Sequence, residues 1–101
     1  MMILGEILQD VHATREDLLI FERKYGVLTE TFYQAYRNGE EPEDDAWVLD
    51  WNEWAGTCEI LLQRQEMYRQ AIQALLEQKS ISNLSHLIGR TARRESLPVA
   101  G

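Results

Sequence analysis

The chain lacks the means to form a covalently stapled or membrane-spanning structure. Its single cysteine, Cys58, cannot form an intramolecular disulfide. No apolar run approaches the ~20 residues that a helix needs to cross a bilayer, and no basic segment followed by an apolar one stands near the first residue. We therefore expect a cytoplasmic protein that is held together by packing alone.

Positive charge is also scarce. The chain has 10 Lys and Arg residues against 17 Asp and Glu residues, a net charge of −7. Broad nucleic-acid binding needs a cationic surface, so this balance argues against it. The charge is uneven, because residues 1–79 carry seven basic and sixteen acidic side chains, net −9, whereas residues 80–101 carry a net charge of +2. An acidic body of this kind favours association with a basic protein.

Motifs for catalysis and metal binding are missing too. There is no glycine-rich phosphate loop and no dinucleotide-binding fingerprint, and the cysteine has no base close to it in sequence. Bundle di-iron sites need a glutamate three residues before a histidine, but Gln9 precedes His12 and Asn83 precedes His86. His12 and Glu16 are one helical turn apart and could form one edge of a metal site, although an ordinary surface pair has the same spacing. We expect no enzymatic activity and no cofactor.

The densest cluster of charge is acidic and lies between residues 40 and 45. It consists of Glu40, Glu41, Glu43, Asp44 and Asp45. Calcium loops place ligands at alternating positions around a central glycine, and this run does not, because its glycine comes first and a proline interrupts it. Acidic residues at the start of a helix are favourable beside the positive end of its dipole. The cluster therefore indicates a helix start, with an acidic docking surface as the second interpretation.

Two long amphipathic helices account for most of the chain. Residues 3–24 have apolar positions at alternating steps of three and four, which predicts a helix that Gly26 ends. Residues 44–79 form a proline-free helix about 55 Å long with one apolar stripe. The members of this second stripe are Trp47, Trp51, Trp54, Cys58, Leu61, Tyr68, Ile72 and Leu75.

Shorter elements complete the prediction. Residues 29–38 form a helix that Thr29 can cap, with Leu28 as a hydrophobic staple, and Asn38-Gly39 ends it. Residues 80–101 form a basic, weakly helical tail, with a helix from Ser82 to Arg94 that Gly89 weakens by about 1 kcal/mol. The fold class is all-α: a helical domain over residues 1–79, with the tail attached. Because the first helix is too short to cover the long stripe, we expect dimerisation or a partner protein to complete the bundle.

The aromatic residues allow two interpretations. Trp51 and Trp54 are expected in the core, closed by nearby aromatic side chains. For Trp47, at the start of the long helix, a core position and an exposed binding anchor are equally open.

One part of the chain resembles a known family. The residues concerned are Phe21-Glu22-Arg23-Lys24-Tyr25-Gly26, Thr29-Glu30-x-Phe32, Tyr36, Gly39-Glu40, Asp44-Asp45 and Trp51. This pattern, within residues 18–62, resembles small helical proteins of bacteria and archaea that are described as antitoxins and encoded beside a toxin, commonly a nuclease. The resemblance implies a self-associating protein that binds and masks a toxin. The chain has no recognisable helix-turn-helix or ribbon-helix-helix module for transcriptional regulation.

These observations predict an antitoxin-like inhibitor that dimerises and contacts a basic toxin directly. The alternative is a homodimeric structural or scaffold protein of a larger assembly, and an orphan metal-dependent enzyme is a third hypothesis. The tail could fold back onto the acidic body or become ordered on a partner. The candidate partner-binding residues are Glu40, Glu41, Asp44, Asp45, Trp47, Tyr68, Arg69, Ile72, Leu75, Leu76, Leu84, Leu87, Arg90, Arg93 and Arg94.

Overall fold

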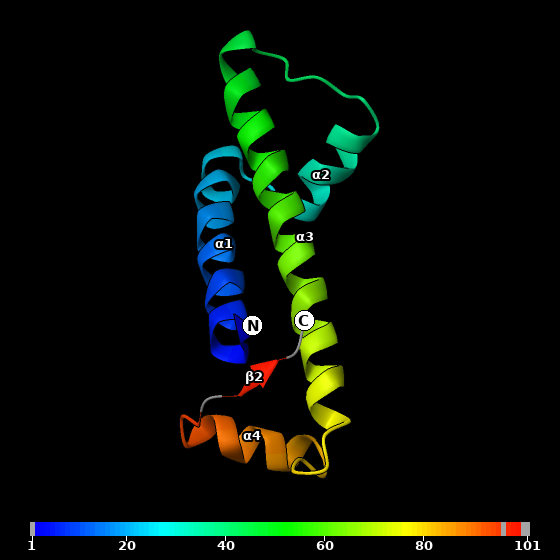
Figure 1. Ribbon diagram of the computed structural model, residues 1–101. Coiled ribbons are helices and arrows are strands. Elements are labelled where there is room, and N and C mark those ends of the chain that lie inside the picture. Colours follow the sequence, from blue (N-terminus) through cyan, green and yellow to red (C-terminus); the bar gives the residue numbers. More distant parts are fainter. Residues whose placement is uncertain (1, 96, 100–101) are drawn as a thin grey trace. The chain divides into compact units, whose positions relative to one another are not determined.

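Figure 1 shows a computed structural model of the chain, which describes residues 2–95 and 97–99. The elements are β1 (Met2–Ile3), α1 (Leu4–Tyr25), α2 (Thr29–Arg37), the 3₁₀ helix η1 (Asp45–Trp47), α3 (Val48–Leu76), α4 (Leu84–Ala92) and β2 (Pro98–Val99). The fold is all-α as predicted, since the two strands have two residues each and pair only with one another. The chain forms two compact units, here called the central unit (His12–Gln63) and the terminal unit (the residues up to Val11 and from Arg64 onward).

The ends of α1 and α2 follow from glycine and from an unexpected cap. Gly26 adopts a positive φ of 78° and its amide donates to the carbonyl of Glu22 at 2.8 Å, so α1 ends where the sequence predicted. The prediction that Thr29 caps α2 is wrong. Leu28 is at the cap position with no side-chain bond, and it is exposed. Instead, the Glu22 carboxylate of α1 accepts from both the amide and the hydroxyl of Thr29, at 2.8 and 2.7 Å.

The long helix is shorter than predicted at both ends. Asp44 does cap, as expected for an aspartate at this point, but it accepts from the amide of Ala46 at 2.9 Å and so begins the 3₁₀ turn η1. α3 then runs over 29 residues, Val48–Leu76, where residues 44–79 had been expected. At 1.5 Å per residue this corresponds to about 44 Å.

The core of the central unit is built around Trp54, whose side chain is 1% exposed. Its ring lies 3.9 Å from that of Phe32 in α2 and is stacked on it, and the rings of Phe21 and Tyr25 in α1 stack at 5.7 and 5.5 Å. The indole Nε1 donates to the hydroxyl of Thr29 at 3.0 Å, so the one polar atom of this ring is satisfied. Cys58 is buried in the same cluster, and Trp51 packs against it half-buried.

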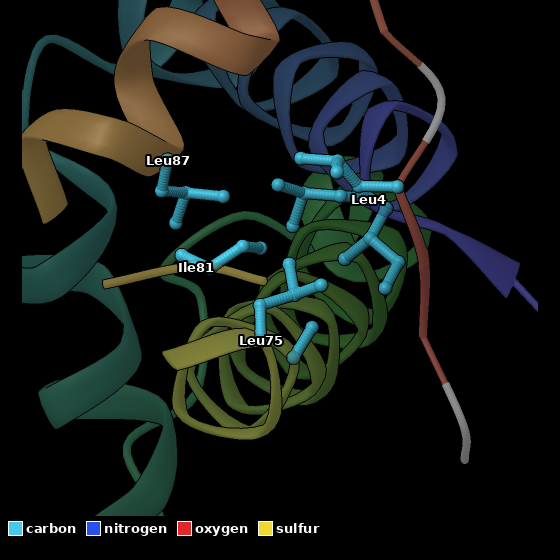
Figure 2. Close-up of a cluster of buried hydrophobic side chains, with 7 residues drawn as sticks. Leu4, Leu75, Ile81 and Leu87 are labelled. Atoms are coloured by element: carbon cyan, nitrogen blue, oxygen red, sulfur yellow. The ribbon is translucent and has the colours of Figure 1, made fainter. Parts of the chain in front are cut away.

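The core of the terminal unit includes part of the long stripe and residues that follow the long helix. It is formed by Leu4, Ile7, Ala71, Leu75, Ile81, Leu87 and Leu97. Figure 2 shows the side chains of Leu4, Leu75, Ile81 and Leu87 pointing toward one another. In the distal part of the long stripe, Leu75 is thus buried together with Ile81, Leu87 and Leu97 of the same chain. The helix expected from Ser82 to Arg94 is present as α4, and residues 96 and 100–101 lie outside the described residues.

Helix α4 is held by its own cap and by the helix end that it covers. Its cap is Asn83, one residue after the predicted Ser82, and the Asn83 Oδ1 accepts from the amide of His86 at 2.8 Å. Leu87 then points into the core and is 3% exposed. Burial of Leu87 therefore stabilises α4, whose helix propensity alone is weak.

Candidate functional site

The acidic run predicted from the sequence lines a hollow in the central unit. Residues 40–44 of the run lie in the loop between α2 and η1, which Figure 1 shows as an extended segment, and Asp45 is the first residue of η1. The hollow has a volume of about 280 Å³ and is lined by Tyr36, Glu40, Glu41, Pro42, Asp45, Val48, Trp51 and Asn52. The carboxylates of Glu40, Glu41 and Asp45 are exposed, so they can meet an external cation without first losing a buried partner.

The surroundings of this hollow are strongly negative. The central unit contains four Lys and Arg residues and twelve Asp and Glu residues, which gives it a net charge of −8. The whole chain has a net charge of −7, so the remaining residues are slightly positive. Tyr36 and Trp51 supply aromatic walls beside the carboxylates. Aromatic faces and carboxylates both attract guanidinium and ammonium groups. The hollow is therefore suited to a basic side chain of another protein.

A second hollow in the same unit is apolar. It has a volume of about 210 Å³ and is lined by Tyr25, Val27, Thr31, Phe32, Ala35, Trp47, Trp51 and Trp54. We call it the aromatic hollow. Trp47 is 38% exposed, and its ring is nearly perpendicular to that of Tyr25, with the two centroids 5.9 Å apart. The sequence left two interpretations of Trp47 open, and the structure gives it a partly exposed place in the wall of this hollow.

A small polar network fixes the position of Tyr25. Lys24 Nζ and Tyr25 Oη both donate to Asp50 Oδ2, at 2.5 and 2.7 Å. These two bonds stabilise the charged carboxylate, so the Lys24 ammonium first, and then the Tyr25 hydroxyl, holds the pKa of Asp50 below its ordinary value. Burial, followed by the bond to Asp50, raises the pKa of Tyr25. α1 and α3 are thereby joined beside the aromatic hollow.

The network predicts a defined acid dependence of stability. Because the pKa of Asp50 is lower in the folded than in the unfolded chain, its stabilisation is present above the unfolded pKa, about 4. It is lost as pH falls through the lowered folded pKa. We expect the unfolding midpoint of Asp50→Asn to depend less on pH below about pH 4 than that of the wild type. Denaturant unfolding at a series of pH values measures this, and parallel profiles for the two proteins would contradict it.

The other candidate partner-binding residues lie in the terminal unit, and two of them are corrected. Leu75 and Leu87 are core residues, 1% and 3% exposed, because α4 packs on the end of α3; they are not available to a partner. Ile72 and Leu76 are partly buried against the same core. Tyr68 is 36% exposed.

The polar and basic candidates of the terminal unit are at its surface. Arg69 pairs with Glu66 one turn earlier in α3. In the last turn of α4 and just after it, Arg90 and Arg93 both pair with Glu95, each at 3.1 Å. Arg94 is exposed, with a φ of 60°, and Leu84 is 54% exposed.

Several residues of the two hollows were not foreseen. Trp51, expected in the core, and Tyr36 both pack partly buried against the core, and both also line the acidic hollow. Val27, which had no assigned role, lines the aromatic hollow together with Ala35, which was expected only on the apolar face of the helix at residues 29–38. Only the position of Val27, between the helix-ending glycine and the cap of α2, hinted at exposure. These walls arise from side chains that are distant in sequence, so local patterns could not reveal them.

Three further observations concern metal ions, membrane helices and similarity to known proteins. Within residues 2–95 and 97–99, no group of three or more His, Cys, Asp or Glu side chains is arranged to hold a metal ion. No helix in the described part of the chain has the length and apolar character needed to cross a bilayer. Comparison with known protein families, curated proteins and solved structures finds no match to this chain.

Proposed function

We propose that the protein is a non-enzymatic, cytoplasmic protein-binding module that inhibits a basic toxin by direct contact. The acidic hollow carries this proposal, because it combines three exposed carboxylates with two aromatic walls in a unit of net charge −8. The resemblance of residues 18–62 to antitoxin-like proteins supports the same function. A toxin that acts on RNA or DNA needs a cationic cleft, and an acidic surface complements such a cleft.

The expected contact is electrostatic at first and specific afterwards. Complementary charge speeds the encounter of two proteins more than it sets the final affinity. Basic side chains of the toxin would then lie between the carboxylates of Glu40, Glu41 and Asp45 and the rings of Tyr36 and Trp51. The inhibitor would act by occupying the surface that the toxin uses for its substrate.

The test is complex formation with the product of the neighbouring gene. We expect the triple variant Glu40→Gln, Glu41→Gln, Asp45→Asn to bind at least about tenfold more weakly than the wild type, mainly through slower association. The control is Glu6→Gln, Glu16→Gln, Glu77→Gln, which removes three exposed carboxylates elsewhere and gives the same net charge of −4. Binding kinetics at two salt concentrations measure the difference. Equal losses in both variants, or no complex with the wild type, would contradict the proposal.

A homodimeric structural protein is the second candidate function. Large apolar side chains remain exposed on three helices, including Ile20 of α1, Leu49 of α3 and Ile88 of α4, at 64, 80 and 64%. Exposed apolar side chains favour association when they are grouped. Sedimentation of the purified chain tests this candidate: a stable dimer that binds no other protein would favour it over the inhibitor.

A further inference from the structure

Helix α4 presents an apolar face that its own unit does not cover. Leu84 and Ile88 are 54 and 64% exposed, and they are neighbours on the helix surface because they are four residues apart. Thr91 and Ala92, also exposed, extend the same face. Leu87, about 100° around the helix from Ile88 and next to Leu84, is buried. The helix is therefore anchored by Leu87 and leaves the side chains beside it exposed as a mainly apolar ridge.

Positive charge accompanies this ridge. Residues 80–95 contain three arginines and one glutamate, a net charge of +2, in a chain whose other residues are net acidic. Arg93 and Arg94 follow directly after the end of α4 and are exposed. The ridge is thus apolar with a cationic end, a chemistry that matches an apolar hollow with acidic surroundings.

The aromatic hollow has these properties. Its volume of about 210 Å³ exceeds the roughly 150 Å³ of a cavity that accepts a benzene ring, so one isoleucine or leucine side chain fits it. Exposed Val27 and Leu28, 41 and 61%, lie in the loop that contributes to its wall. Asp44 and Asp45 come shortly before Trp47 in the chain, in the unit of net charge −8.

We propose that two copies of this chain associate by placing Ile88 of α4 of one copy in the aromatic hollow of the other. The arginines after α4 meet the acidic surroundings of that hollow. This inference does not depend on the inhibitor function, because it concerns contacts between identical chains. The contact differs from the one through the long helix that the sequence suggested, where Leu75 is buried in the core beside α4.

The size of the contact implies that it is made twice. A nine-residue helix with two large apolar side chains is small beside the ~1,200–2,000 Å² that a stable interface buries. Each copy carries both the ridge and the hollow, so in a two-fold arrangement the contact is made twice and the buried area doubles, while α4 stays packed in its own unit. Closed two-fold dimers of this kind are the commonest protein assemblies.

Sedimentation equilibrium of the full chain tests the proposal. We expect a wild-type dimer whose dissociation constant rises with salt, and an Ile88→Glu variant that dissociates about tenfold more readily or worse. The control is Leu49→Glu, which introduces the same charge at a helical side chain that is 80% exposed and does not line the aromatic hollow. Circular dichroism verifies that each variant is folded.

A complementary variant distinguishes this contact from any other. Ala35→Trp fills the aromatic hollow and is expected to dissociate like Ile88→Glu. An equimolar mixture of the two variants retains one intact ridge and one intact hollow, so it should regain one of the two contacts and associate more strongly than either variant alone, but more weakly than the wild type. A wild-type monomer, an Ile88→Glu dimer of unchanged affinity, weakening by Leu49→Glu to the same extent, or a mixture with no regained association would each overturn the proposal.

Discussion

Replacement of Trp54 by alanine is expected to lower the free energy of unfolding by about 3–5 kcal/mol. The indole is 1% exposed and stacks on Phe32, Phe21 and Tyr25, so its loss leaves a cavity lined by three rings. Thr29 also loses the indole donor of its hydrogen bond. For a small domain whose total stability is about 5–15 kcal/mol, this change approaches complete unfolding.

Urea unfolding monitored by circular dichroism measures this effect. Trp47→Ala is the matched control, because the same residue type at 38% exposure lies in the wall of a hollow and not within the core. We expect the control to cost clearly less than Trp54→Ala. Trp54→Phe keeps a stacked ring but loses the indole N–H and part of the buried volume, so we expect a loss smaller than that of Trp54→Ala, made up of the bond to Thr29 and a small cavity. Equal effects of the two alanine variants would show that the core is not centred on Trp54.

Leu87→Ala is expected to cost about 2–5 kcal/mol, a large effect for a residue in a segment that the sequence suggests is a tail. Leu87 is 3% exposed and packs in the cluster that contains Leu75 and Ile81, so truncation removes apolar contacts from the end of α3 as well as from α4. Chemical denaturation at low protein concentration, where association does not contribute, measures the loss.

Leu84→Ala supplies the comparison for this prediction. It removes the same atoms one turn earlier in α4, from a side chain that is 54% exposed, and should change stability by no more than about 0.5–1 kcal/mol. If the two variants are equally stable, α4 does not pack on the core of the terminal unit. A partner protein would then again be expected to cover the apolar residues at the end of α3.

The helices themselves could be predicted because their signals are local. Gly26 ends α1 through its positive φ, and Asp44 caps the start of the η1–α3 segment, both as the residue types indicate. The burial of Trp54 and Cys58 follows from their positions on one apolar stripe. These features depend on neighbours within a few residues, and a sequence shows such neighbours directly.

Tertiary contacts account for the errors. Thr29 has the right residue type for a cap, but Glu22 lies close enough to its amide to take that role. Gly89 suggested a weak α4, whereas burial of Leu87, Ile81 and Leu97 against α1 and α3 stabilises that helix. The contribution of such contacts outweighs a propensity difference of about 1 kcal/mol.

The candidate site was predictable in its charge but not in its shape. The acidic run at residues 40–45 is visible in the sequence, and the structure places Glu40, Glu41 and Asp45 in one hollow. The walls of both hollows come from consecutive elements that pack together across the loops between them, with Trp51 common to the two. Which stripe residues face a hollow and which face the core depends on the crossing of α2 and α3, which periodicity does not specify.

The buried thiol of Cys58 makes spontaneous opening of the central unit measurable. Burial raises the pKa of this thiol, and the nearby carboxylates of Glu59 and Glu30 raise it further, so the folded protein should react slowly with alkylating reagents. Because the chain has one cysteine, each alkylated molecule is one in which the central unit opened far enough to expose the Cys58 sulfur. The alkylation rate relative to that of a free thiol thus gives the free energy of local opening without denaturant.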